Sequence, residues 1–123
     1  MPLKILSIDG GGTRGLIPPT ILHCIEKEFG KSPVELFDLF AGTSTGGIIS
    51  IALAAGLPAS ALVDLYLNKS KDIFWEPLLD RLQGMDEHLQ ANYGNKRFRK
   101  ILQDLFGEKT LGDIHKDKKF GGR

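Results

Sequence analysis

The sequence is poor in cysteine and in long apolar runs, and each shortage excludes a class of protein. Cys24 is the single cysteine among 123 residues. It excludes an internal disulfide framework and any metal site built from several cysteines. The longest apolar stretch, "IISIALAAG" at 48–56, falls far short of the ~20 residues that a membrane-spanning helix needs. The opening "MPLKILSIDGG" lacks the apolar core of a secretory signal. These features favour a soluble, cytoplasmic protein.

Charge of one sign is also lacking. The formal net charge is +1 at pH 7, so the chain has no long-range field that would attract nucleic acid or an anionic membrane. We therefore expect no nucleic-acid partner. With 41% apolar and 25% charged residues, the composition is that of one globular domain. The polar, glycine-ended tail at 115–123 is expected to fray.

Apolar patterning predicts two strand–turn–helix units in the first half of the chain. The run "LKILSI" at 3–8 is typical of a buried parallel strand. Helical spacing follows over 15–29 and ends at Gly30. "DLFAG" at 38–42 predicts a second strand, and "TGGIISIALAAG" at 45–56 a second helix. Alternating strands and helices predict an α/β fold with a parallel sheet.

The second half is less regular. We expect a helix over 60–74 that has Ser60 as its N-cap and turns Leu62, Leu65, Tyr66 and Ile73 inward. A last helix is expected to begin after Asn95 and close at Gly107. Only two or three strands are visible, which is few for a sheet covered on both faces. The sequence therefore predicts a chain that stops before its sheet is complete.

Residues 10–15, "GGGTRG", match the pattern GxGxxG between a strand and a helix. A dinucleotide site would also need an acidic residue at the end of the second strand, where this chain has "AGTSTGG". A Walker loop is excluded because no Gly-Lys-Ser/Thr follows. Nucleotide binding stays a minor alternative.

A second glycine motif, Gly42-x-Ser44-x-Gly46, follows the second strand. If the two strands are parallel neighbours joined by a right-handed crossover, their carboxyl ends lie at one sheet edge, about 5 Å apart. The glycine loop at 10–12 then faces Ser44. A serine on a strand-to-helix turn, held out by glycines, is typical of a nucleophile that attacks an ester carbonyl.

The backbone of the glycine loop offers the complementary group. A tight loop at a helix N-terminus leaves the N–H groups of Gly10, Gly11 and Gly12 free, and they favour negative charge. The N–H of Thr45, the residue after the serine, adds a further donor. These four amides predict an oxyanion hole for the tetrahedral intermediate of acyl transfer.

The two motifs and their surroundings, "ILSIDGGGTRGL" at 5–16 and "LFDLFAGTSTGGIISIALAAG" at 36–56, resemble the N-terminal part of a patatin-like phospholipase, and "LFGEKTLGDI" at 105–114 extends the likeness. The resemblance implies that residues 1–123 are the N-terminal part of a single domain. It also implies an α/β fold with a parallel sheet in three layers, here truncated.

The implied activity is that of a carboxylic-ester hydrolase in lipid metabolism, which cleaves fatty-acyl esters of phospholipids, galactolipids or similar substrates. Such an enzyme needs no metal and no organic cofactor, and it would contact membrane surfaces transiently as a peripheral protein. The resemblance makes Ser44 the nucleophile and Gly10 to Gly12 the oxyanion loop. Arg14 supports this loop, as do the remaining motif glycines Gly15, Gly42 and Gly46.

The general base that the resemblance calls for is not found in this chain. The family uses a serine–aspartate dyad whose aspartate lies far downstream in an Asp-Gly-Gly or Asp-Gly-Ala motif. Here Asp-Gly-Gly occurs only at Asp9, inside the glycine loop, and Asp-Gly-Ala does not occur. Three histidines, His23, His88 and His115, are more typical of helix-face or solvated positions. We expect the base to lie outside this chain. If the chain is complete, the alternative is an inactive module that binds acyl lipid or phosphate.

Overall fold

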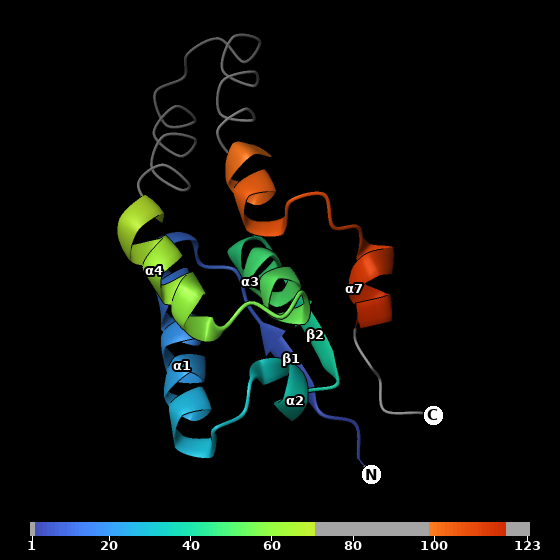
Figure 1. The fold of residues 1–123 in the computed structure, drawn as a ribbon. Helices are drawn as coiled ribbons and strands as arrows, with labels where there is room; N and C mark the ends of the chain where they lie inside the picture. Colours follow the sequence, from blue (N-terminus) through green and yellow to red (C-terminus); the bar gives the residue numbers. More distant parts are fainter. Residues whose placement is uncertain (1, 71–98, 118–123) are drawn as a thin grey trace, which may run out of the picture.

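A computed structural model describes residues 2–70 and 99–117 (Figure 1). Residues 99–106 are also helical. In chain order the named elements are strand β1 (Ile5–Ile8), 3-10 helix η1 (Gly12–Leu16), helices α1 (Ile17–Phe29) and α2 (Pro33–Leu36), strand β2 (Leu39–Gly42), and helices α3 (Thr45–Ala54), α4 (Ala59–Ser70) and α7 (Leu111–Asp117).

The two strands form a small parallel sheet, as predicted from their apolar runs. The register pairs Ile5 with Leu39 and Ile8 with Gly42. Both strands therefore end at the same edge, from which the chain enters η1 after β1 and α3 after β2. This arrangement confirms the α/β fold and brings the two glycine motifs to one edge of the sheet.

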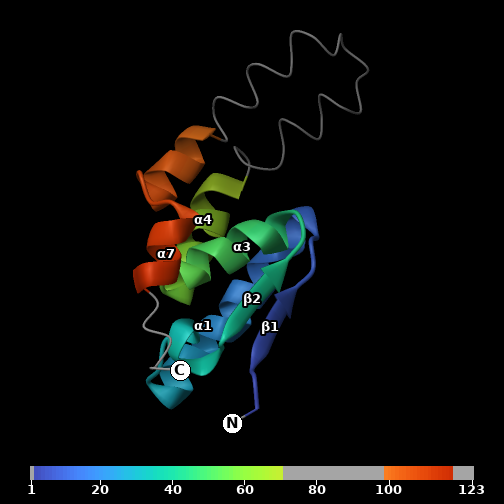
Figure 2. The ribbon, with the colours of Figure 1, turned by 90° about the vertical axis from the view of Figure 1, so that its right-hand side faces the viewer.

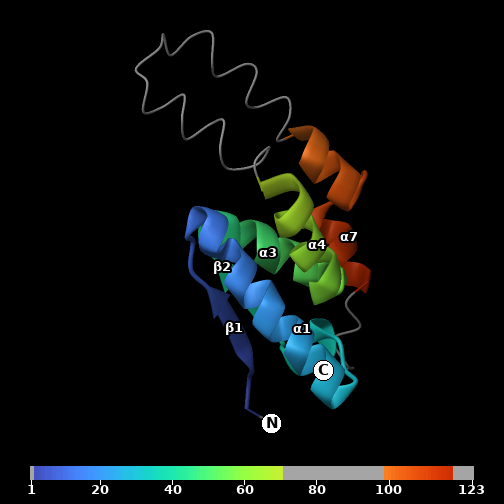
Figure 3. The same ribbon diagram turned by 90° about the vertical axis from the view of Figure 1, so that its left-hand side faces the viewer.

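The helices lie on one side of this sheet. Figures 2 and 3 view the molecule from opposite sides, and in both β1 lies at one margin with α1, α3, α4 and α7 beyond it. On the opposite face, Ile5 is 53% exposed and Leu39 is 48% exposed. Side chains alternate along a strand, so Leu6 and Phe40 point to the helices and pack on the core. The described residues thus cover one face of the sheet.

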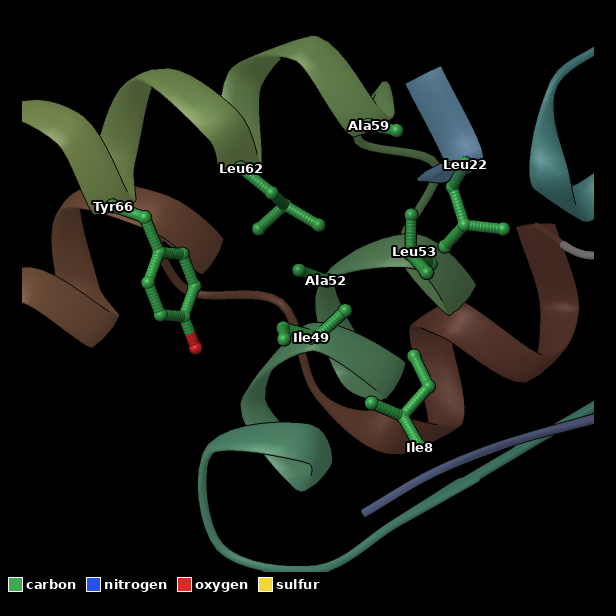
Figure 4. Close-up of a cluster of buried hydrophobic side chains, with 8 residues drawn as sticks. All are labelled: Ile8, Leu22, Ile49, Ala52, Leu53, Ala59, Leu62 and Tyr66. Carbon is green, nitrogen blue, oxygen red and sulfur yellow. The ribbon is translucent and has the colours of Figure 1, made fainter. Parts of the chain in front are cut away.

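The hydrophobic core lies between β1 and helices α1, α3 and α4 (Figure 4). It confirms that the helix after residue 60 turns Leu62 and Tyr66 inward. Because α3 begins directly after Ser44, this core holds the first turn of α3 behind the glycine motifs. Its buried members are Ile8, Leu22, Ile49, Ala52, Leu53, Ala59, Leu62 and Tyr66.

Helix ends agree with the glycine signals and differ at one predicted cap. α1 ends at Gly30 with φ 62°, and the helical stretch 99–106 ends at Gly107 with φ 57°. The prediction of Ser60 as an N-cap is wrong, because α4 begins one residue earlier, at Ala59. The Glu26 carboxylate accepts hydrogen bonds from the Ala59 N–H at 3.1 and 3.2 Å. A carboxylate from α1 thus satisfies the start of α4.

The apolar pattern did not predict the two short helices α2 and α7. α2 carries a capping box of Ser32 and Glu35. α7 begins with a similar pair: the Thr110 N–H donates to Asp113 Oδ2 at 2.9 Å, and the Asp113 N–H donates to Thr110 Oγ1 at 3.2 Å. α7 includes 115–117, which the sequence analysis assigned to the frayed tail. The predicted Asn95 cap, His88, the end of the 60–74 helix and positions 118–123 lie outside the described residues.

The capping box of α2 predicts a pH dependence of stability. The Ser32 hydroxyl and backbone N–H donate to Glu35 Oε2 at 2.7 and 2.8 Å, and these bonds lower the pKa of the Glu35 carboxyl. A lowered pKa stabilises the folded state at pH values above the unfolded-state pKa of about 4.3. This stabilisation is lost as the pH falls through the folded-state pKa.

The Tm advantage of the wild type over Glu35→Gln should therefore shrink between pH 7 and pH 3, as measured by thermal unfolding. Ser32→Ala removes the main donor and should weaken the same pH dependence. A Tm difference that is equal at both pH values would contradict this assignment.

Candidate functional site

Ser44 occupies the sharp turn between β2 and α3. Its backbone has φ 51° and ψ −123°, and it is the one non-glycine residue with positive φ in the described part of the chain. Such a conformation costs on the order of 1–3 kcal/mol and persists only where the surrounding structure enforces it. The Ser44 side chain is exposed. The sequence-predicted strand-to-helix turn is therefore present, with its serine presented to solvent.

The flanking glycines are required by backbone packing. A Cβ on Gly42 would overlap the carbonyl of Gly46, and a Cβ on Gly46 would overlap the carbonyl of Ile8. The Thr43 N–H donates to the same Ile8 carbonyl at 3.2 Å, which extends the β1–β2 pairing into the turn. Gly42 and Gly46 thus let β1, β2 and α3 approach closely enough to force the Ser44 conformation.

The glycine loop after β1 lies directly against this turn. A Cβ on Gly10 would lie 2.8 Å from the Ser44 Cβ and 2.9 Å from the Thr43 carbonyl oxygen. Only glycine allows this approach without a shift of the loop. The structure therefore brings together two motifs that lie in separate parts of the sequence.

Two of the three loop amides that we expected to be free are hydrogen-bonded to side chains. Gly10 N–H donates to Thr43 Oγ1 at 3.1 Å, and Gly11 N–H donates to Thr45 Oγ1 at 3.2 Å. For the N–H groups of Gly12 and Thr45 we find no acceptor within the described residues. Two of the four predicted donors thus hold the loop, and two remain available to a ligand.

Arg14 and Gly15, at the end of the first motif, help to fix the shape of the loop. The Arg14 N–H donates to the Gly11 carbonyl at 3.1 Å and closes the turn, while its side chain is exposed and forms no ion pair with the described residues. A Cβ on Gly15 would overlap the Tyr66 hydroxyl. Gly15 therefore leaves room for a side chain from α4, which sequence reasoning had assigned only to the core.

Tyr66 joins the site through Thr45. Its side chain is 3% exposed, and its hydroxyl faces the Thr45 side chain. Burial raises the pKa of the Tyr66 hydroxyl, so this hydroxyl stays protonated at neutral pH. The roles of Thr43 and Tyr66 were missed in the sequence. Thr43 lies beside the serine, but nothing local marks Tyr66.

Two of the three histidines, His23 and His115, lie in the described ranges. His23 Nδ1 lies 3.6 Å from Glu26 Oε2, the carboxylate that caps α4 beyond the far end of α3. His115 lies on α7. No group of three or more potential metal-ligating side chains gathers within residues 2–70 and 99–117. The same ranges contain no helix of the length and apolarity needed to cross a bilayer.

The family profile described as patatin-like phospholipase matches residues 6–121. The chain belongs to this family. The match spans both glycine motifs, the Ser44 turn and α7.

Curated relatives agree with this assignment. Patatin-like protein 2 of Oryza sativa subsp. indica is 39% identical over 131 residues, covering 94% of this chain and 31% of the relative. The cGAMP-activated phospholipase of Pseudomonas aeruginosa is 35% identical over 111 residues, covering 89% and 33%. Phospholipase A I of Arabidopsis thaliana is 48% identical over 75 residues, covering 60% and 6%.

The chain spans about a third of the length of the first two of these relatives. No solved structure gives a significant match. The family assignment therefore rests on sequence similarity.

Proposed function

We propose that this chain carries the nucleophile half of a serine lipid acyl hydrolase of the phospholipase A or esterase type. One observation carries the proposal: Ser44 stands exposed on a strained strand-to-helix turn, with the glycine loop packed against its Cβ. A turn serine without chemistry has no need of a conformation that costs on the order of 1–3 kcal/mol.

In the proposed reaction, Ser44 Oγ attacks the acyl carbonyl of the substrate and the carbonyl π electrons move to its oxygen. The N–H groups of Gly12 and Thr45 hydrogen-bond this oxyanion, supported by the N-terminus of α3. An aspartate outside this chain accepts the Ser44 proton and passes it to the departing alcohol. Water then hydrolyses the acyl-enzyme and regenerates Ser44.

The proposed substrates are acyl esters of phospholipids, galactolipids or related lipids. The names of the phospholipase relatives support a lipid substrate. The exposed position of Ser44 suits a substrate that is presented at a membrane surface. We place the protein in the cytoplasm, in peripheral contact with membranes, and assign it neither a metal nor an organic cofactor.

The complete domain is proposed to have three layers with the sheet in the middle. The exposed apolar side chains Ile5 and Leu39 on the face away from the helices support this arrangement, because such a parallel sheet is usually covered on both faces.

Covalent labelling tests the function. A fluorophosphonate probe should modify Ser44 in the full-length protein, as located by peptide mass spectrometry. Ser44→Ala should take up no probe. Ser60→Ala is the matched control and should be labelled like the wild type, because Ser60 lies on α4, which follows the opposite end of α3.

Two outcomes would contradict the proposal: no labelling of the folded wild type, or equal labelling of Ser44→Ala. Vesicle binding by a folded protein that shows neither labelling nor ester turnover would favour the alternative of a non-catalytic acyl-lipid-binding module.

A further inference from the structure

We propose that the hydroxyls of Thr43 and Thr45 are positioning groups that fix the glycine loop over Ser44, and that Tyr66 fixes Thr45 in turn. This inference rests on the proposed hydrolase function and extends it to side-chain hydroxyls that do not touch the substrate. It assigns the amides of Gly10 and Gly11 to holding the loop.

The two threonines flank Ser44 and bind two successive amides of the loop. Thr43 Oγ1 accepts from Gly10 N–H at 3.1 Å, and Thr45 Oγ1 accepts from Gly11 N–H at 3.2 Å. The loop and the nucleophile turn are thus joined by a matched pair of hydrogen bonds. A displacement of the loop relative to Ser44 would break both.

The backbone of each threonine is itself held. The Thr43 N–H donates to the Ile8 carbonyl at 3.2 Å, and the Thr43 carbonyl accepts from the Gly46 N–H at 2.9 Å. Thr45 is the first residue of α3 and is 4% exposed. The backbone of Thr43 is thus held by the sheet and that of Thr45 by α3. Their hydroxyls therefore occupy fixed positions, and their hydrogen bonds restrain the loop.

Tyr66 links this pair to a third element. In Figure 4 its side chain extends from α4 toward the first turn of α3, where its hydroxyl faces Thr45. A threonine hydroxyl can accept from one group and donate to another. Thr45 Oγ1 accepts from Gly11 and keeps its own proton to direct at the Tyr66 oxygen beside it, while Gly15 leaves the space that Tyr66 fills.

This geometry determines which kinetic constant the threonines control. The two threonine hydrogen bonds act on the loop that carries the free Gly12 amide, and not on a surface that would hold an acyl chain. Loss of either hydrogen bond leaves a loop amide without its acceptor and lets the loop move away from Ser44. Stabilisation of the transition state should suffer, whereas binding of the ground state should not.

The test compares Thr45→Val, which matches the shape of threonine without the hydroxyl, with Thr45→Ser, which keeps the hydroxyl. In the full-length protein, with a soluble p-nitrophenyl acyl ester as substrate, Thr45→Val should lower kcat roughly tenfold at unchanged KM. Thr45→Ser should recover most of kcat. Tyr66→Phe should reduce kcat in the same direction and less strongly.

Backbone amide hydrogen exchange supplies a readout that needs no turnover. Exchange at Gly10 and Gly11 should be faster in Thr45→Val than in the wild type and near the wild-type rate in Thr45→Ser. If the wild type hydrolyses no ester and takes up no fluorophosphonate, the proposed function fails, and the exchange rates still decide whether the threonines hold the loop.

Three results would overturn the inference: unchanged exchange at Gly10 and Gly11 in Thr45→Val, a kcat that is unchanged or higher in that variant, or a failure of Thr45→Ser to recover kcat. A higher kcat would mean that the Gly11 amide is an oxyanion donor that Thr45 withholds. If thermal unfolding shows that Thr45→Val does not fold, Thr43→Val replaces it with the same expected changes, because Thr43 is exposed and its loss disturbs no core packing.

Discussion

Ser44→Ala in the full-length protein should lower kcat/KM for lipid ester hydrolysis by at least about 10³-fold. The variant keeps the glycine loop, its amides and the sheet edge, so the proposed oxyanion donors survive while the proposed attacking oxygen is lost. Release of fatty acid from phospholipid vesicles and hydrolysis of a soluble ester would both report the loss. Retention of a substantial fraction of wild-type activity would exclude Ser44 as the nucleophile.

A companion variant separates chemistry from backbone strain. Ser44→Gly also lacks the hydroxyl and should be equally inactive, but glycine adopts φ 51° without the steric cost that alanine meets. Urea unfolding should therefore give Ser44→Gly a free energy of unfolding about 1 kcal/mol above that of Ser44→Ala. Equal stability of the two variants would mean that the turn stores no strain.

Gly46→Ala should be among the most damaging substitutions in the chain, with a loss of roughly 3 kcal/mol or more in the free energy of unfolding. The added Cβ would overlap the carbonyl of Ile8. That carbonyl accepts from the Thr43 N–H at 3.2 Å, so it cannot move without loss of the hydrogen bond that extends the strand pairing into the Ser44 turn. Denaturant unfolding and soluble yield measure the effect.

The neighbouring glycine is a matched control. A Cβ on Gly47 meets the Gly42 carbonyl oxygen at 3.4 Å, an ordinary contact, and alanine is favoured over glycine inside a helix by up to ~1 kcal/mol. Gly47→Ala should therefore be as stable as the wild type or more stable. If both substitutions had the same effect, the close approach of α3 to β1 would not be the reason for Gly46.

Much of the first half of the fold could be predicted because its signals are local. The strand before residue 9, the helix end at Gly30 and the serine turn each follow from a few adjacent residues. Their meeting at one edge then follows from the rules of parallel sheets. The family resemblance pointed to the same residues.

The remaining features depend on partners that are distant in the sequence. Glu26 caps α4 across 33 positions, and the Gly10 and Gly11 amides find hydroxyls 33 and 34 positions away. Tyr66 fits the apolar stripe of its helix, and only the packed structure aligns it with Gly15 and Thr45. Short helices such as α2 bury too little of one face to give a periodic pattern, although their capping residues are visible in the sequence once the helix is known.

The hydrogen bonds between loop and turn also bear on the order of folding during synthesis. Within residues 2–70 and 99–117, the contacts that shape the Ser44 turn come from residues 8–66. The loop is closed over 33 or 34 positions, a separation at which chain-closure entropy grows only slowly with length. This segment leaves the ribosome before any residue that follows it. Because the described contacts lie within this segment, the Ser44 turn can form early, and under the proposed function it would then precede the aspartate that activates the serine.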